Sequence, residues 1–317
     1  MKKFFGKIFL LLFIVLTIVT ICLVLPPGNL SKNYLLFAQK NKNDLLANTP
    51  GPRIILVGGS NVSFGINSKI LKDSLNLNPV NTALHAGIGL KFMLNSTIDY
   101  VRENDIVVLS PEYQQFYGNL SDGQVELLTL LIDVSPQTGN VNFRQFVKLL
   151  SHIPKYSSSK LRLWNYFKKA DTTTIGIYDR KSFNAYGDAY VHWTLPKVPV
   201  MPFDVLKGNL NEDAFNSLLI FREKVQNRKA QLFITFPCCQ DISFKHSIVQ
   251  IKKIEKRLRA EAFILLGTPE RYIFPDSLTF NTPYHLIKKG VDQRTALLAE
   301  DLKKHLWPFL GKTIKKE

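Results

Sequence analysis

The sequence predicts an α/β fold, in which helices cover both faces of a roughly five-stranded parallel sheet, preceded by a transmembrane helix. Short apolar runs recur along the chain and stop at Gly, Ser or Pro, as strands buried on both faces do. Amphipathic segments of helical length separate these runs, which is the alternation typical of a parallel sheet. An uncharged stretch near the start is long enough to span a bilayer.

The membrane anchor is predicted from Ile8–Leu25, a run of 18 residues without a charge. At about 1.5 Å per residue it reaches about 27 Å, close to the hydrocarbon thickness of a bilayer. The run ends in a Pro pair with no small-x-small pattern before it, which favours an uncleaved anchor over a signal peptide. Lys2, Lys3 and Lys7 precede the run and are expected to stay in the cytoplasm. The prediction is a single-pass membrane protein with an extracytoplasmic C-terminal domain.

The rest of the chain divides by composition. Residues 1–25 form the cytoplasmic N-terminus and anchor, residues 26–52 are expected to be a linker because they are rich in Pro, Asn and Lys, and residues 53–310 form one large domain. Within that domain, residues 114–210 break the alternation with many aromatic, Lys, Ser and Thr residues. We expect them to be an insertion packed over the sheet.

The elements of the domain follow from where each apolar run stops. RIILVGG stops at a Gly pair, DIVVL at Ser-Pro and QLFITF at Pro. The predicted strands are Arg53–Gly59, Pro79–Leu84, Asp105–Leu109, Gln231–Phe236 and Phe263–Leu266. The predicted helices are Ile66–Leu75, Gly89–Arg102, 211–228, 244–260 and 286–306. This order is that of a flavodoxin-like three-layer α/β/α domain.

Composition limits the partners. The balance of 41 Lys+Arg against 25 Asp+Glu gives a formal net charge of +16, which favours anionic neighbours such as membrane lipid or an acidic polymer. No phosphate-binding glycine motif follows a strand, and an extracytoplasmic domain does not meet nucleic acid. Three cysteines are too few for a disulfide scaffold, and none of them has zinc-site spacing. No metal or cofactor is expected.

Candidate site residues follow the strands, because ligands of open α/β sheets bind beyond the carboxyl ends of the strands. Ser60 follows the first strand after two glycines, Gly87 follows the second, and His285 lies just before the last helix. A hydroxyl nucleophile needs a base that takes its proton, and His is the usual one. Ser60 and His285 at one edge of the sheet therefore predict a nucleophile and its base.

This pattern resembles the SGNH (GDSL-like) hydrolase superfamily, in particular its membrane-anchored, DltD-like envelope branch. VGGSN stands in place of the family's first block with Ser60 as nucleophile, Gly87 matches its oxyanion glycine, and NTPYHLIKKG matches its last block with His285. The resemblance spans about residues 53–306. It implies an acyl esterase or O-acyltransferase that acts on cell-envelope carbohydrate, without a cofactor or metal.

Three positions depart from the family pattern. Gly59 replaces the Asp of the first block, and the third block, around Glu112, lacks its oxyanion Asn, for which Asn61 is a replacement donor. Asn281 stands where the acidic triad member is expected, with Asp276 as a substitute from the preceding loop. A Ser–His dyad, a weak enzyme and an inactive descendant remain open.

Two further candidates are suggested by their positions in the sequence rather than by a match to the family. Glu112, after the third strand, is a candidate contact for a substrate hydroxyl. Asp188 and His192 would share a face if their segment were helical, although Asn-x-x-Gly-Asp also fits a turn. The alternative function is a catalytically inactive SGNH-like envelope protein that binds or scaffolds polysaccharide, with export or modification proteins as partners.

Overall fold

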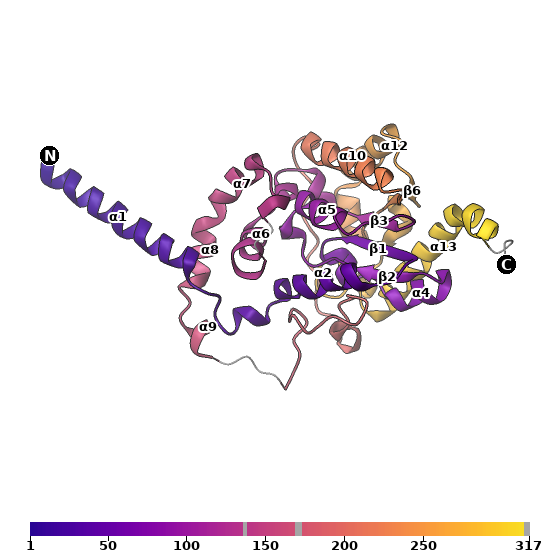
Figure 1. The fold of residues 1–317 in the computed structure, drawn as a ribbon, viewed down its shortest axis with the longest axis horizontal. Coiled ribbons are helices and arrows are strands. Elements are labelled where there is room, and N and C mark those ends of the chain that lie inside the picture. Colours follow the sequence, from indigo (N-terminus) through magenta and orange to yellow (C-terminus); the bar gives the residue numbers. More distant parts are fainter. Residues whose placement is uncertain (136–137, 169–172, 314–317) are drawn as a thin grey trace.

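The computed structural model describes residues 1–135, 138–168 and 173–313. Its centre is a five-stranded, all-parallel sheet in the order β2-β1-β3-β4-β6 (Figure 1). The strands are β1 (Arg53–Gly58), β2 (Asn78–Asn81), β3 (Ile106–Ser110), β4 (Gln231–Thr235) and β6 (Leu265–Leu266). This is the flavodoxin-like doubly wound order, so the predicted fold class is confirmed.

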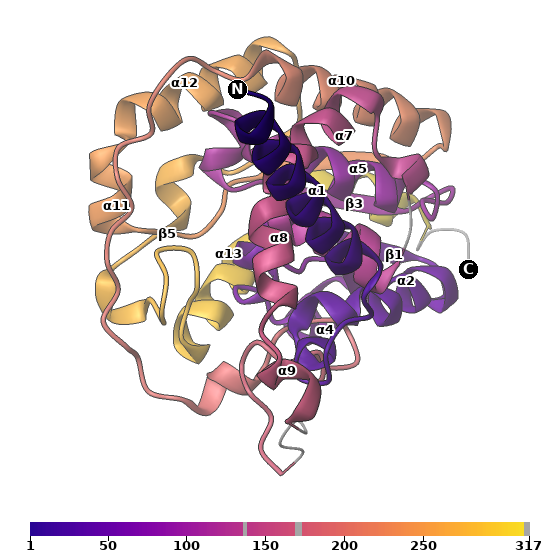
Figure 2. The ribbon, with the colours of Figure 1, turned by 90° about the vertical axis from the view of Figure 1, so that its left-hand side faces the viewer.

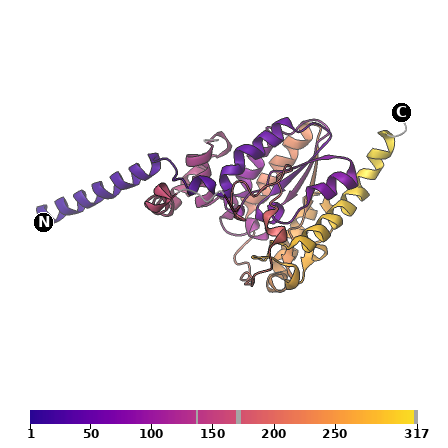
Figure 3. The same cartoon turned by 90° about the horizontal axis from the view of Figure 1, so that it is seen from below.

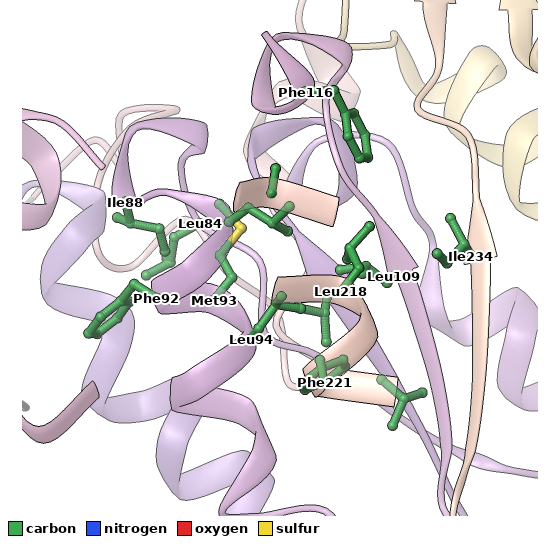
Figure 4. Packing of buried hydrophobic residues seen from close by; sticks show 14 of the residues in the cluster. Leu84, Ile88, Phe92, Met93, Leu94, Leu109, Phe116, Leu218, Phe221 and Ile234 are labelled. Carbon is green, nitrogen blue, oxygen red and sulfur yellow. The ribbon is translucent and has the colours of Figure 1, made fainter. Parts of the chain in front are cut away.

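Alternate residues of each strand pack into two separate cores, because successive side chains of a strand point to opposite faces. In β1, Ile55 and Val57 belong to one core, and Ile54 and Leu56 to the other. Helices α5 (Leu90–Ile98), α10 (Glu212–Asn227) and α12 (Ile248–Ala260) cover the first face, and α4 (Ser68–Leu75) and α13 (Lys288–Thr313) cover the second. Figure 4 shows part of the first core, where Phe92 and Leu94 of α5 and Leu218 and Phe221 of α10 pack near the strands.

Several predicted boundaries moved, among them the end of the helix expected at Gly89–Arg102, which stops at Ile98, and the start of the strand expected at Phe263–Leu266, which begins at Leu265. Two of the shifts have a local reason. The second strand ends at Asn81, three residues early, because the Asn81 side chain accepts the backbone N–H of Ala83 at 3.1 Å and turns the chain. The helix expected at 244–260 is divided at Ser247 into α11 (Asp241–His246) and α12. The Ser247 hydroxyl there accepts the N–H of Leu206 at 3.0 Å.

The segment expected to be a linker is folded onto the domain. It contains α2 (Gln39–Asn48), and Leu35, Leu36 and Leu46 are buried in the first core. The Arg53 guanidinium donates to the Leu46 carbonyl. Composition was a poor guide here, because a few apolar residues in a polar segment are enough to dock it.

The insertion holds short helices rather than strands of the main sheet. They include α6 (Val125–Thr129), α7 (Phe143–Leu149), α8 (Ile153–Lys160) and α9 (Trp164–Phe167). A separate two-stranded parallel pair, β5 (Cys239–Gln240) and β7 (Ile273–Phe274), follows later in the chain.

The N-terminal helix α1 (Lys2–Val24) is the one helix of the described residues that is long and apolar enough to cross a membrane, with a mean hydropathy of 2.9. It projects from the domain, and α13 ends at the opposite end of the molecule (Figures 1 and 3). Within α1 only Cys22 is buried, where the end of the helix packs on α8.

Candidate active site

The turn that carries Ser60 is tightly packed. β1 ends at Gly58, and Ser60 opens the short helix α3 (Ser60–Ser63) with its side chain partly exposed. A Cβ atom at position 59 would lie 2.8 Å from the Ala86 Cα and 2.6 Å from one carboxylate oxygen of Glu112, with the other still closer. Only glycine fits such a position, so the Glu112 carboxylate occupies the space that the family's Asp would need.

Asn61 is a fixed part of this turn. Its side-chain amide donates to the Ser110 carbonyl at 2.9 Å, and its backbone N–H donates to Glu112 Oε1 at 3.1 Å. The buried guanidinium of Arg294, from α13, donates to the backbone and side-chain oxygens of Asn61 and to the Ser110 hydroxyl. The expected role of Asn61 as a replacement oxyanion donor has no support here, because both kinds of donor on Asn61 are engaged within the scaffold.

Glu112 lies against the turn that carries Ser60 and is buried. Its Oε1 accepts from Asn61, and its Oε2 is a buried atom without a hydrogen-bond partner among the described residues. Contact with a substrate hydroxyl stays a prediction for this residue.

His285 is held by a neutral amide. Asn281 Oδ1 lies 2.8 Å from His285 Nδ1, and Asn281 Nδ2 donates to the Tyr178 hydroxyl at 2.7 Å. Because Tyr178 takes the amide N–H, the oxygen faces the ring, so Nδ1 carries the proton and Nε2 carries a lone pair. This is the tautomer that a general base needs.

The His285 ring lies close to the turn that carries Ser60. It stacks on Phe64 with ring centroids 4.3 Å apart and planes at 10°, and Phe64 follows Ser60 by one helical turn. Nε2 is buried and has no hydrogen-bond partner in the part of the chain that the structure describes. The Ser60–His285 hydrogen bond is therefore not formed in this state, and their pairing stays a prediction.

Burial sets the charge of the two buried histidines. It lowers the pKa of His285 to about 3, helped by the nearby His192 and His85. It likewise lowers the pKa of His192, which packs between Phe64 and Phe280, to about 4. Both imidazoles are neutral at neutral pH, so His285 is in the correct protonation state for a base but is a weak one.

The surroundings of Gly87 differ from those that its expected oxyanion role needs. Its N–H donates to His85 Nδ1 at 3.0 Å, and a Cβ on Gly87 would collide with the carboxylate of Glu126, from α6. Glu126 Oε2 is buried without a hydrogen-bond partner among the described residues. An oxyanion role for Gly87 requires the His85 ring to move first.

The remaining sequence candidates lie apart from His285 or have structural roles. Asp276 binds Lys197 and accepts from Gln240 Nε2 at 2.7 Å, so it is not the partner of His285. Asp188 lies in a turn rather than a helix, and its carboxylate accepts hydrogen bonds from Ser68 and Asn81. The helical pairing of Asp188 with His192 is therefore wrong, and the turn is confirmed.

Sequence reasoning missed four residues of the site. Phe64, Glu126, Tyr178 and Arg294 come from four different segments of the chain. Phe64 and Arg294 look like ordinary core and helix residues in the sequence, and Tyr178 is one aromatic among many in the insertion. No group of three or more His, Cys, Asp or Glu side chains in the described ranges is arranged to hold a metal ion.

Comparisons with known proteins give little beyond this geometry. No family model matches the chain, and no curated protein matches it. Among solved structures, an acetyl xylan esterase from the rumen bacterium Butyrivibrio proteoclasticus is similar over 83% of this chain and 67% of its own, with 10% identity and a TM-score of 0.31. A likeness at this TM-score supports no conclusion about fold or activity.

Proposed function

We propose that this protein is a membrane-anchored, SGNH-like acyl esterase or O-acyltransferase that acts on cell-envelope carbohydrate. One observation carries the proposal. The buried Nε2 of His285 has no partner, while Nδ1 is held by Asn281 and the ring is stacked one helical turn from Ser60. A buried ring nitrogen without a partner is costly, and a base that waits for the proton of a nucleophile explains that cost.

In the proposed reaction, Ser60 Oγ attacks the acyl carbonyl and its proton passes to His285 Nε2. The tetrahedral intermediate then collapses, and the sugar alcohol leaves with that proton, so that an acyl-Ser60 ester remains. Water, or a hydroxyl of a second sugar, attacks this ester with His285 again as the base, which gives hydrolysis or transfer respectively. Asn281 orients the ring but supplies no charge to the imidazolium, so we expect slow turnover.

The anchor belongs to the same proposal. α1 is long and apolar enough to cross a bilayer, and Lys2, Lys3 and Lys7 lie at its start. The lysines favour a cytoplasmic N-terminus, which places the domain and its substrate outside the cytoplasm.

A second candidate function is a catalytically inactive envelope protein that binds or scaffolds polysaccharide for export or modification. It is favoured by the surroundings of Gly87, whose N–H is already bonded to His85 and whose neighbour Glu126 is a carboxylate. Negative charge at that place opposes a developing oxyanion.

Labelling with a fluorophosphonate probe separates the two. The enzyme labels at Ser60, as shown by peptide mapping, and both Ser60→Ala and His285→Ala lose the label. Ser158→Ala is the matched control, because Ser158 is exposed and bonds only the carbonyl of Lys155 on its own helix. The outcome that favours the inactive envelope protein has two parts. Wild type and the Ser158→Ala control neither label nor cleave an acetyl ester, and an acetylated oligosaccharide still binds to both.

A further inference from the structure

Helix α7, which precedes α8 in the chain, exposes a regular apolar stripe. Phe143, Phe146 and Val147 of α7 and Leu150 just after it recur with the spacing of one helix face, and Phe143 is 81% exposed. A stripe with this spacing normally faces a core. The buried side of α7 is instead formed by Gln145 and Leu149.

Further exposed apolar residues follow α8: Leu161 and Leu163 lie between α8 and α9, and Trp164 and Phe167 lie on α9. Of these, Phe167 is 80% exposed. We call the two sets together the α7–α9 surface: Phe143, Phe146, Val147, Leu150, Leu161, Leu163, Trp164 and Phe167. Exposed large apolar residues gathered on one side of a domain are typical of an interaction site.

The α7–α9 surface is fixed to the end of α1. Cys22 of α1 is buried against α8, and Lys160 of α8 donates to the Leu25 carbonyl at 2.8 Å. The Asn29 side-chain amide donates to the Tyr166 carbonyl at 2.7 Å, and the Leu30 N–H donates to the Asn165 carbonyl at 3.1 Å. These two bonds hold α9 against the segment that follows α1. Figures 1 and 2 show α7, α8 and α9 on the side of the domain from which α1 leaves.

Helix length sets the depth of this surface. The 23 residues of α1 reach about 34 Å at 1.5 Å each, little more than the hydrocarbon thickness of about 30 Å. Cys22 lies two residues before the end of α1. Helix α8, which covers Cys22, therefore lies at the boundary between acyl chains and headgroups.

The charge of the segment fits an anionic membrane. Residues 141–168 contain no Asp or Glu, and their basic residues are Arg144, Lys148, Lys155, Lys160, Arg162 and Lys168. Three of them pair with acidic residues elsewhere, whereas Lys155, Arg162 and Lys168 are exposed and form no ion pair among the described residues. Basic residues beside apolar ones are typical of segments that lie in a membrane interface.

We propose that the α7–α9 surface lies in the interfacial layer of the bilayer that α1 crosses, with its aromatic and aliphatic side chains among the acyl chains and its basic residues at anionic headgroups. The inference rests on the membrane anchor of the proposed function, and on no part of the proposed chemistry. The domain then lies on the outer face of the membrane, in addition to being anchored by α1.

Site-directed spin labelling of the full chain in phosphatidylglycerol vesicles tests this. All three native cysteines are buried, so a nitroxide goes to an introduced cysteine. The test positions are Phe143→Cys and Phe167→Cys, and Val249→Cys is the matched control, because Val249 is also exposed but lies on α12, away from α1 (Figure 1). Leu12→Cys reports on α1 itself.

We expect positions 143 and 167 to lose access to a water-soluble nickel chelate and to gain collisions with oxygen, relative to position 249. Exchange for phosphatidylcholine vesicles should restore part of the chelate access, since the basic residues then lose their partners. If position 12 is in the bilayer but 143 and 167 behave like 249, the inference is overturned while the anchor stands. If position 12 is itself open to the chelate, anchor and inference fall together. Shielding from both reagents would mean a protein surface covers these residues, such as a second copy, and would also overturn the inference.

Discussion

Asn281 is the residue on which the chemistry of this site depends. It holds His285 through Nδ1, as an acidic residue would, but it is neutral, and its amide orientation is set by the Tyr178 hydroxyl. The consequence is an imidazole in the correct tautomer whose protonated form no charge stabilises. Burial then lowers the pKa of His285 to about 3, far from the value near the operating pH that suits a base.

The first prediction, which rests on the proposed function, is that Asn281→Asp increases the turnover of an acetyl ester. A carboxylate beside Nδ1 favours the imidazolium, so the pKa of His285 rises. Turnover of an acetyl ester should increase by up to about 10⁴-fold, the value of this charge in a serine protease. The acid limb of the pH–rate profile should move to higher pH with the pKa. Kinetics and histidine NMR check the two effects.

Asp276→Ala is the control for that experiment. Asp276 pairs with Lys197 and Gln240 rather than with His285, so its removal should leave turnover and the pKa of His285 unchanged. Loss of all activity in Asp276→Ala would instead show that His285 depends on Asp276.

A second prediction concerns Tyr178. Tyr178→Phe removes the acceptor that orients the Asn281 amide, so that the amide can turn its N–H₂ toward His285. We expect up to about tenfold slower labelling of Ser60, the value of one hydrogen bond. In an Asn281→Asp background the same change should cost much less, because both carboxylate oxygens are acceptors. Equal losses in the two backgrounds would assign Tyr178 a packing role only.

Acid should destabilise the fold through its buried histidines. His192 and His285 have folded pKa values of about 4 and about 3, below their ordinary value of 6.5. At a pH between the folded pKa and 6.5, each of these histidines binds more protons in the unfolded state than in the folded state. The free energy of unfolding therefore falls as pH drops below about 6.5. Each histidine contributes at most about 1.4 kcal/mol per pH unit.

Denaturant titrations at pH 7 and pH 5 measure this dependence. His192→Phe, which suits the aromatic surroundings of Phe64 and Phe280, should reduce the loss between the two pH values. His246→Gln is the control, because His246 is exposed, and it should keep the full loss. A His192→Phe variant with an undiminished pH dependence would contradict the assignment.

At the scale of elements, the sequence predicted what depends on local pattern. The apolar runs of β1, β3 and β4 end where the structure ends them, within one residue, because buried strands must stop where Gly, Ser or Pro turns the chain. It did not predict that α2 docks on the first core, or that Tyr178 reaches Asn281 from 103 residues away. Such contacts depend on how the insertion packs, which has no periodic signal.

Arg294 shows the same limit and yields a prediction. From α13 it binds two oxygens of Asn61 and the Ser110 hydroxyl at once, so one planar guanidinium fixes the turn that carries Ser60. Arg294→Lys replaces the planar guanidinium with a single ammonium group. We expect the labelling of Ser60 to slow by about a hundredfold, which is typical when a reacting group is displaced by about 1 Å. Arg271→Lys, which changes an ion pair with Glu300 and Asp301, is the control. Equal labelling rates in both variants would mean that Arg294 does not position the turn.

At the scale of the whole molecule, the candidate site lies on the side of the domain from which α1 leaves. The N–H of Gln124, just before α6, donates to the Gly87 carbonyl at 2.8 Å, α6 packs on α8, and α8 packs on α1. Figure 1 shows α6 and α8 between the sheet and α1. The carboxyl edge of the sheet therefore points toward the membrane surface if α1 crosses the bilayer.

This orientation predicts a preference for substrate presented at the membrane. In the proposed function, an acetylated sugar carried on a lipid shares the membrane surface with the protein, and confinement of two partners raises their effective concentration without any new contact. We expect the full chain in vesicles to cleave a lipid-linked acetyl sugar at least about tenfold faster than the same sugar in solution at equal total concentration. Dilution of the surface with unlabelled lipid should remove the advantage, and Ser60→Ala should abolish both activities. Equal rates for the two substrates would place the opening of the site away from the bilayer, even if Ser60 and His285 carry the chemistry.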